Sequence, residues 1–179
     1  MASPPPAPRP GDRSDAALLA AHLAGDPHAF AELYGRHHQR LHRLARLHTR
    51  TAEDAADALQ DAMLAAHRGA AGFRHQAAVG SWLYRIVLNA CLDQLRRATE
   101  HAPLDGEPTQ CDPSAQVVTA VTVRRALLSL PAEQRAAVTA VDLDGYPVAE
   151  AARLLGVPAG TVKSRCARGR ARLAALLAA

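Results

Sequence analysis

Apolar residues along this chain recur mainly at steps of three and four positions, which is the spacing of one face of an α-helix. The stretch that begins near Pro27 shows this repeat most clearly. Its apolar stripe consists of Phe30, Leu33, Tyr34, Leu41, Leu44 and Leu47. No segment alternates convincingly in the two-residue rhythm of a half-buried β-strand. We therefore predict an all-α protein.

Capping residues predict two more helices in the first part of the chain. Ser14 or Asp15 can cap a helix that runs to about Ala24 and stops at a Gly-Asp-Pro sequence. Thr51 and Asp54 form a variant capping box, which opens a helix over residues 52–68. The apolar face of that helix consists of Ala55, Leu59, Ala62 or Met63, and Ala66, and its opposite face consists of Asp54, Asp57 and Asp61.

A further helix is predicted after a loop over residues 73–80. We expect Ser81 to cap this helix and the helix to run from Trp82 to about Arg97. One of its stripes is polar and aromatic, and consists of Trp82, Arg85, Asn89, Asp93 and Arg96. An aromatic ring beside a guanidinium and an amide is what unpaired nucleic-acid bases need. Core packing of Trp82 is the alternative, because a tryptophan at a helix start more often packs.

The C-terminal part of the chain has the spacing of a helix-turn-helix. A Tyr-Pro pair at residues 146–147 starts one helix, Gly156 suits the reversal at its end, and Pro158 starts the next. The apolar stripe of the second helix consists of Val162, Cys166, Gly169 and Leu173. We therefore predict that Cys166 is a core residue and not a redox sensor.

By elimination, the outward face of this second helix is basic. It consists of Thr161, Lys163, Ser164, Arg165, Arg168 and Arg172. Residues 163–172 carry five cations and no acid, which is the electrostatic footprint of phosphate-backbone binding. Residues near the helix N-terminus would reach base edges, and flanking Arg, Thr and Ser would hold phosphates. An ordinary helical hairpin with a solvated face is the alternative.

Proline-rich segments divide the chain into two domains. Residues 1–13 contain five prolines, which favour a disordered arm. Residues 99–116 contain three prolines, four acidic residues and no Lys or Arg, so we expect a flexible acidic linker there. The two domains would then cover residues 14–98 and 117–179.

Composition narrows the class of protein. The 179 residues are 49 % hydrophobic, too apolar for a disordered chain, and no run approaches the roughly 20 apolar residues of a membrane helix. The N-terminus lacks the apolar core of a secretory signal. Cys91, Cys111 and Cys166 are too scattered for a disulfide framework or a zinc finger. We expect a soluble cytoplasmic protein.

Nine histidines raise the alternative of a metal-dependent enzyme or sensor. His38 and His42 lie four residues apart on a predicted helix, with His37 and His48 nearby. No Cys or carboxylate stands at a matching offset, so we expect solvated surface histidines and no metal or cofactor. The sequence also lacks a Gly-x-Ser-x-Gly motif, a phosphate loop and a dinucleotide fingerprint. We therefore do not expect an enzyme.

Several segments together resemble the bacterial RNA polymerase sigma factors of the extracytoplasmic-function (ECF) class. Residues 52–63 (AEDAADALQDAM) resemble the helix of sigma domain two that docks on the polymerase clamp. Residues 72–74 (GFR) and 81–93 (SWLYRIVLNACLD) resemble the loop and helix that open the promoter. Residues 130–135 (LPAEQR) and 160–165 (GTVKSR) resemble sigma domain four.

This resemblance covers about residues 15–98 and 117–177 in the family's order, and is greatest to the actinobacterial M-type group. It implies that residues 14–98 bind core polymerase and recognise and melt the minus-ten region, and that residues 117–179 recognise the minus-thirty-five region. The implied partners are core RNA polymerase (the clamp of its largest subunit and the flap of its second), promoter DNA, and an anti-sigma factor in a stress response. The free chain would be a monomer.

The resemblance also implies roles for individual residues. The clamp contact would involve Asp57, Gln60, Asp61 and Met63, whose carboxylates suit a basic partner. Minus-ten binding would involve Phe73, Arg74, Trp82, Arg85, Asn89 and Arg96. The loop over residues 74–80 would hold a flipped base, although its sequence (RHQAAVG) lacks the small polar or acidic residues that are frequent there in the family. Minus-thirty-five binding would involve the outward face of the helix-turn-helix.

A helix-turn-helix regulator that binds operators without core polymerase is the main alternative. Such a protein would share the second domain. It predicts an apolar ligand pocket and a dimer seam over residues 14–98, and the sequence shows neither. It also leaves the acidic helix and the Trp82 stripe unexplained. Binding to core polymerase separates the two hypotheses.

Overall fold

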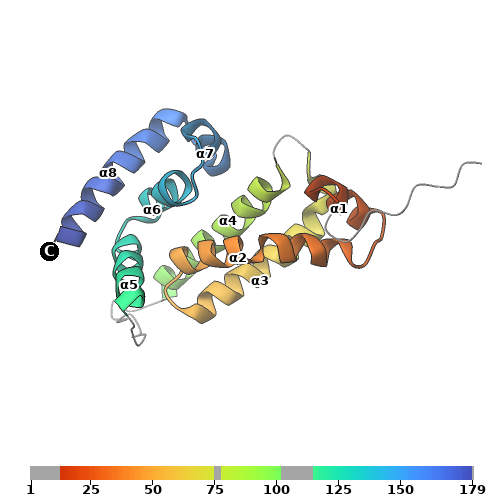
Figure 1. Cartoon of the computed structure of the whole chain (residues 1–179), viewed down its shortest axis with the longest axis horizontal. Helices are drawn as coiled ribbons and strands as arrows, with labels where there is room; N and C mark the ends of the chain where they lie inside the picture. Colours follow the sequence, from red (N-terminus) through yellow and green to blue (C-terminus); the bar gives the residue numbers. More distant parts are fainter. Residues whose placement is uncertain (1–12, 75–77, 102–114, 179) are drawn as a thin grey trace, which may run out of the picture.

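The computed structural model describes residues 13–74, 78–101 and 115–178 (Figure 1). Every regular element in these ranges is helical, which confirms the all-α prediction. The elements are α1 (Asp15–Leu23), α2 (Ala29–His48), α3 (Ala52–Gly69), the 3-10 turn η1 (Ala70–Gly72), α4 (Val79–His101), α5 (Ala115–Leu128), α6 (Ala132–Val138), the π-helical turn η2 (Thr139–Leu143), α7 (Val148–Leu155) and α8 (Ala159–Ala178).

Helices α1 to α4 form the first domain, in which α3 packs along both α2 and α4. The leucine stripe that the sequence predicts for α2 supplies Leu33, Leu41 and Leu44 to the core, each 1 % exposed. Burial of each of these side chains stabilises the domain by about 2 kcal/mol. The buried face of α3 consists mostly of alanines, so that neighbouring helices can approach it closely.

The predicted caps of α1 and α3 are confirmed. The Ser14 hydroxyl accepts a hydrogen bond from the Ala17 amide at 3.2 Å. At the start of α3, the Thr51 hydroxyl accepts from the Asp54 amide at 3.0 Å, and the Asp54 carboxylate accepts from the Thr51 amide at 3.1 Å. Both helices therefore begin where local sequence chemistry satisfies their first amides.

Helix α4 begins earlier than the sequence indicates. The Ser81 amide donates to the Ala78 carbonyl at 3.0 Å, so Ser81 lies inside the first turn and is not the N-cap. Val79 is buried in the core. Gly80 lies against α2, where a Cβ atom would come within 2.9 Å of Cε1 of His37. Packing between α4 and α2, which no local pattern reveals, therefore sets the start of the helix.

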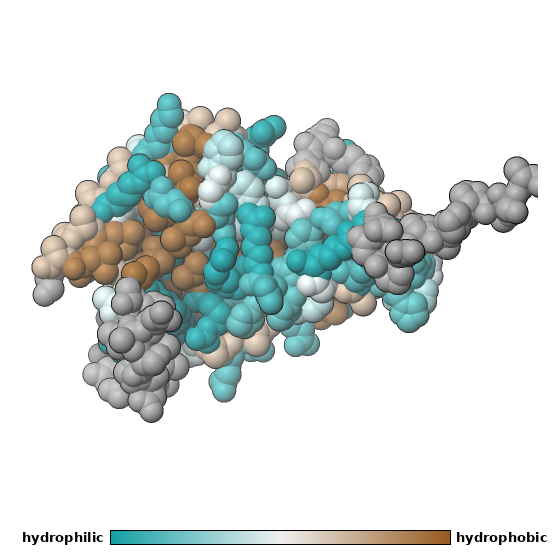
Figure 2. Space-filling model, in the orientation of Figure 1, coloured by the Kyte–Doolittle hydropathy of each residue, from teal (hydrophilic) through white to brown (hydrophobic). Residues whose placement is uncertain are grey.

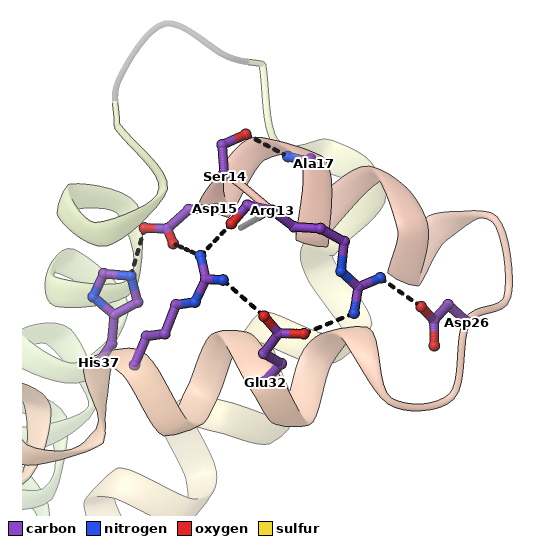
Figure 3. Close-up of polar contacts among 8 residues, drawn as sticks. Arg13, Ser14, Asp15, Ala17, Asp26, Glu32 and His37 are labelled. Carbon is purple, nitrogen blue, oxygen red and sulfur yellow. Dashed lines mark hydrogen bonds and ion pairs between the residues drawn. The ribbon is translucent and has the colours of Figure 1, made fainter. Parts of the chain in front are cut away.

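A polar network joins α1 to α2 at the N-terminal end of the described chain (Figure 3). Arg13 donates to Asp26 at 2.8 Å and to Glu32 at 2.7 Å, and its hydrogen bond lowers the pKa of Asp26. Asp15 lies 2.7 Å from Nε2 of His37. The prediction of a disordered arm is therefore wrong for Arg13, while residues 1–12 of that arm lie outside the described residues.

Helices α5 to α8 form the second domain, in which α8 packs on α5, α6 and α7. Gly156 ends α7 in the left-handed conformation, with φ 66°, and the predicted helix-turn-helix is present. Val162 and Cys166 are buried as predicted. A Cβ atom on Gly169 would come within 2.7 Å of Cγ2 of Val138, so only glycine permits this approach of α8 to α6.

The two domains are packed against each other. Helices α5 and α6 contact α2, and α7 contacts α4 (Figure 1). One apolar cluster runs through both domains, and Leu47 of α2 packs in a second cluster with Leu127 of α5. Arg124 of α5 donates to the main-chain carbonyls of Arg46 at 2.9 Å and Thr49 at 3.1 Å. The sequence predicted two domains separated by a flexible linker, and it did not predict this contact between them, which we call the seam.

Both ends of the predicted linker are helical, because α4 continues to His101 and α5 begins at Ala115. Residues 102–114, which include Cys111, lie outside the described residues, as do residues 75–77 of the predicted base-binding loop. Among the helices that the structure describes, none combines the length and apolarity needed to span a bilayer.

Candidate nucleic-acid interface

Helix α8 lies along one edge of the molecule (Figure 1) and carries basic side chains on its exposed side. Lys163, Ser164, Arg168 and Arg172 are exposed, and Thr161 is half-buried. The buried stripe on the other side of α8 holds the helix against α6 and α7. The basic face is therefore presented by a helix whose orientation the core fixes, as the recognition helix of a helix-turn-helix requires.

Two cations of α8 are paired with acids that precede the helix-turn-helix. Arg165 donates to Glu133 of α6 at 2.6 Å, and the Arg165 side chain is only 18 % exposed. Arg170 donates to both carboxylate oxygens of Asp142, at 2.7 Å and 3.0 Å. Arg165, which the sequence places on the outward face, therefore lies back along α6 because Glu133 draws it there.

A cleft of about 690 Å³ lies where α4 begins. Phe73 and Trp82 line it from the first domain, and their ring centroids are 5.2 Å apart. Arg74 and Arg85 line it as well, and Arg153 of α7 contributes to the opposite wall. The cleft thus combines aromatic faces with guanidinium groups, which is the chemistry that binds unpaired bases and their phosphates.

The stripe predicted on α4 is exposed along the rest of its length. Asn89 and Arg96 lie beyond the cleft, and Arg96 pairs with Asp93 at 2.9 Å. At the start of the helix, the Ser81 hydroxyl donates to Glu150 of α7 at 3.3 Å. The second domain therefore touches the nucleic-acid surface that the sequence predicts for the first domain.

The predicted clamp residues lie on or beside a groove between α2 and α3. Asp57, Gln60 and Asp61 are exposed, and Met63 is partly buried against the core. Gln60 and Met63 line the groove, which has a volume of about 520 Å³, whereas Asp57 and Asp61 are not among its lining residues. A groove with an apolar floor and exposed carboxylates nearby suits a partner with apolar anchors and basic groups.

Apolar surface also gathers at the end of the molecule that α6 and α8 form (Figure 2). Leu176 and Leu177 lie in the last turns of α8, and Leu143 is the last residue of η2. These three leucines are 43–49 % exposed. The second domain thus exposes large apolar side chains in addition to its basic ones.

Comparison with known proteins matches both domains. The Sigma-70 region 2 profile matches residues 33–101, and the Sigma-70, region 4 profile matches residues 120–173. The chain is 67 % identical over 168 residues to the ECF RNA polymerase sigma factor SigM of Mycobacterium tuberculosis, with 93 % of this chain and 86 % of that protein covered. The chain belongs to the ECF RNA polymerase sigma factors.

Other relatives of this sigma factor lie further away in sequence. It is 30 % identical over 176 residues to the ECF RNA polymerase sigma-E factor of Escherichia coli, with 88 % of this chain and 91 % of that protein covered. CnrH, solved in complex with the cytosolic domain of CnrY, matches 92 % of this chain with a TM-score of 0.72 and 28 % identity, over 97 % of its own chain. The sigma factor RpoE of Bartonella quintana, solved with the anti-sigma factor NepR, matches 84 % of this chain with a TM-score of 0.67 and 26 % identity, over 97 % of its own chain.

The sequence did not predict the polar cluster that links the two domains of this sigma factor. Asp144, in the loop before α7, accepts hydrogen bonds from the Tyr84 hydroxyl at 2.9 Å and from Arg43 at 3.0 Å. The Arg40 guanidinium lies over the rings of Tyr84 and Tyr146, at 5.5 Å and 4.8 Å from their centroids. These residues come from three separate segments, so no spacing along the chain could have united them.

A second buried polar cluster lies at the same seam. His48 is 1 % exposed and neither ring nitrogen has a hydrogen-bond partner among the described residues, so the prediction of a surface histidine is wrong here. Burial, together with the nearby charge of Arg135, lowers the pKa of His48 to about 3. Burial also lowers the pKa of Arg135 and raises the pKa of Cys91 to about 12. His48 is therefore neutral and Cys91 is a protonated core thiol.

The remaining histidines of α2 contact other side chains. The rings of His38 and His42 stack with centroids 5.8 Å apart beside the clamp groove, and His37 pairs with Asp15. Within the described ranges, no group of three or more His, Cys, Asp or Glu residues is arranged to hold a metal ion.

Proposed function

We propose that this sigma factor binds core RNA polymerase and directs it to promoters. In this proposal residues 14–98 bind the polymerase and recognise and melt the minus-ten region, and residues 117–179 recognise the minus-thirty-five region. The observation that carries the proposal is the match of both domains, in one chain, to sigma regions 2 and 4 and to SigM over 93 % of this chain.

The helix-turn-helix would contact the minus-thirty-five region through α8. Thr161, Lys163 and Ser164 lie in its N-terminal part, from which side chains reach base edges in the major groove. Arg168 and Arg172 lie one and two turns further on, where phosphates would run. Arg165 would exchange Glu133 for a base or a phosphate on binding, since its ion pair with that exposed acid is weak.

The cleft and the exposed stripe of α4 would hold the melted minus-ten strand. Phe73 and Trp82 would stack on extruded bases, and Arg74 and Arg85 would neutralise the phosphates beside them. Asn89 and Arg96 would contact the strand further along the same helix. Extrusion of a base costs a few kcal/mol, which this stacking would offset.

The polymerase clamp would bind the groove between α2 and α3. Met63 and Gln60 would supply an apolar anchor and an amide from inside the groove, and Asp57 and Asp61 would pair with basic residues of the clamp. The flap of the second large subunit would bind the second domain. We extend the anti-sigma partnership of relatives such as RpoE to this chain, which would act in a stress response in the cytoplasm.

Sigma factors in general are not enzymes, and in this proposal the chain performs no chemistry itself. It would act as a monomer that lends promoter selectivity to the polymerase. Run-off transcription with core polymerase and genomic fragments tests this directly. Specific transcripts should appear only when the chain is added. An unchanged transcript pattern, together with tight binding to a palindromic operator, would favour the regulator hypothesis instead.

The clamp assignment has its own test. Asp61→Arg reverses an exposed charge on α3 without touching the core, so the fold should persist while affinity for core polymerase falls at least tenfold. Glu53→Gln is the matched control, because Glu53 lies in the first turn of the same helix and interacts chiefly with the helix dipole. Equal core affinity of Asp61→Arg and the unchanged chain in a pull-down titration would remove the assignment.

A further inference from the structure

Asp144 is a nearly buried carboxylate that the second domain inserts into the first. It lies in the loop between η2 and α7, just before Gly145, whose φ of 71° turns the chain. Its side chain is only 4 % exposed. Among the described residues, the partners of its carboxylate all belong to the first domain: Arg43 at 3.0 Å, the Tyr84 hydroxyl at 2.9 Å, and Arg40 at 4.0 Å.

Those three partners make a preformed site for an anion. Arg40 lies over the ring of Tyr84 in its own domain and, while the domains are packed, also over the ring of Tyr146, and Arg43 reaches the carboxylate from the next turn of α2. Among the described residues, no carboxylate other than Asp144 lies within 4.0 Å of either guanidinium. If the domains part, two guanidiniums and a phenolic hydroxyl converge on an unfilled position, and guanidinium forks fit phosphate as well as carboxylate.

The proposed function, on which this inference rests, requires the domains to part. The minus-ten and minus-thirty-five regions lie about 25 base pairs apart, which is about 85 Å of duplex at 3.4 Å per pair. In the structure, α7 instead lies against α4, and the Ser81 hydroxyl donates a hydrogen bond to Glu150. The packed chain therefore cannot contact both promoter regions at once.

The position of the site points to nucleic acid. Tyr84 lies one helical turn after Ser81, which lines the cleft together with Trp82 and Arg85. A strand bound in that cleft would carry its phosphates past the adjoining turn of α4. The Arg43 side chain is 62 % exposed even in the packed chain, so a strand has access to it.

We infer that Arg40, Arg43 and the Tyr84 hydroxyl form a phosphate-binding site, which Asp144 fills while the domains are packed together and a phosphate of the promoter strand fills once they part. Asp144 is then a competitor built into the chain. It keeps the free protein from holding single-stranded DNA tightly, and it leaves the site when polymerase separates the domains.

The test uses the full chain and a fluorescent single-stranded DNA 20-mer of mixed sequence, because a phosphate contact does not depend on sequence. Asp144→Asn removes the competing charge and keeps the side-chain shape. It should raise the affinity for the 20-mer several-fold in fluorescence anisotropy. It should also increase the radius of gyration of the free chain in small-angle X-ray scattering.

The decisive measurement is made in the Asp144→Asn background, where the seam contact is already weakened. Arg43→Ala should there lower the affinity several-fold and reduce the slope of log affinity against log salt by about 0.7, the value for one lost contact to a single strand. Tyr84→Phe should lower the affinity by a smaller factor. Arg46→Ala is the matched control, because Arg46 lies one turn further along α2 and has no contact with Asp144.

Three results would overturn the inference. Equal losses for Arg43→Ala and Arg46→Ala would mean that only overall charge matters. A gain in affinity on Arg43→Ala in the Asp144→Asn background would mean that the cluster serves the seam alone. Loss of binding to core polymerase without loss of DNA binding would assign the site to a polymerase carboxylate. None of these depends on run-off transcription, so failure of the proposed function is recognised separately.

Discussion

The two helices that we assign to DNA, α4 and α8, differ in how much of their polar face is open in the free chain. On α8, Lys163, Arg168 and Arg172 are exposed, and the buried stripe packs within the same domain. On α4, the first turns instead face α7 of the other domain across the cleft. The helix proposed to read duplex DNA is thus open, and the helix proposed to hold melted DNA is partly covered.

This difference has a physical basis in what each helix buries. Helix α8 satisfies its apolar stripe with its neighbours α6 and α7, so its outward face remains polar and open. Helix α4 has apolar residues on two sides, since Leu83 and Val87 face its own domain while Tyr84 meets Tyr146 at 5.4 Å between ring centroids. A helix with two apolar sides is stabilised when a second element packs on its other side.

The largest expected effect is a loss of stability of the second domain when α8 is forced away from α6. Gly169→Leu places a side chain where even a Cβ atom would lie 2.7 Å from Val138, and should destabilise the second domain by about 3 kcal/mol. Urea unfolding followed by circular dichroism should show an early transition. The single tryptophan, Trp82, should report a later one from the first domain.

Gly160→Leu is the control for that experiment. It adds the same side chain to the same helix at a position where no atom lies within 4 Å of a built Cβ. It should leave the urea midpoint nearly unchanged. Equal destabilisation by the two substitutions would show that the approach of α8 to α6 does not govern the effect, since helix propensity alone favours leucine over glycine at both positions.

A smaller loss of stability is expected when the pH is lowered, because His48 is buried at the seam. Because the folded chain holds His48 at a pKa of about 3, the unfolded chain binds an extra proton below the ordinary pKa of 6.5. The free energy of unfolding should therefore fall by roughly 2 kcal/mol between pH 7 and pH 5. Among the described residues, the charged groups near His48 include Arg135, Arg50, Asp54 and Arg124, which donates to the carbonyls of Thr49 and Arg50.

Urea titrations of substituted chains isolate the histidine. His48→Leu should flatten the pH dependence, whereas His42→Ala, at an exposed position on the same helix, should leave it in place. A His48→Leu chain that loses stability as steeply as the unchanged protein would show that carboxylates, not His48, produce the slope.

The smallest effect is expected on the open helix. Lys163→Ala should weaken binding of the holoenzyme to the minus-thirty-five region by roughly 1 kcal/mol. Glu133→Gln should change it less, because the acid pairs with Arg165 at the surface. Footprinting of the upstream promoter region measures both. Protection of that region by Lys163→Ala at the same concentration as the unchanged chain would contradict the role of α8.

Local elements of the fold were predictable because their causes are local. The Thr51–Asp54 capping box, the reversal at Gly156 and the buried stripe through Cys166 each depend on residues within two helical turns. Of the residues predicted to face outward on α8, Lys163, Ser164, Arg168 and Arg172 are exposed and Thr161 is half-buried. Arg165 is drawn aside by Glu133, which lies outside that window. The predicted start of α4 was wrong, because it depends on a contact with another helix: Gly80 lies against His37 of α2.

The sequence by itself determined most of the helices, the helix-turn-helix, and the polar stripes on α4 and α8. Spacing, caps and charge act over a few residues, so the chain pattern reveals them. The tertiary structure alone decided that the domains meet, that His48 is buried and that Asp144 lies between Arg43 and Tyr84. Those contacts join residues 60 to 101 positions apart. Periodicity specifies which face of a helix is apolar, but only packing specifies which partner covers it.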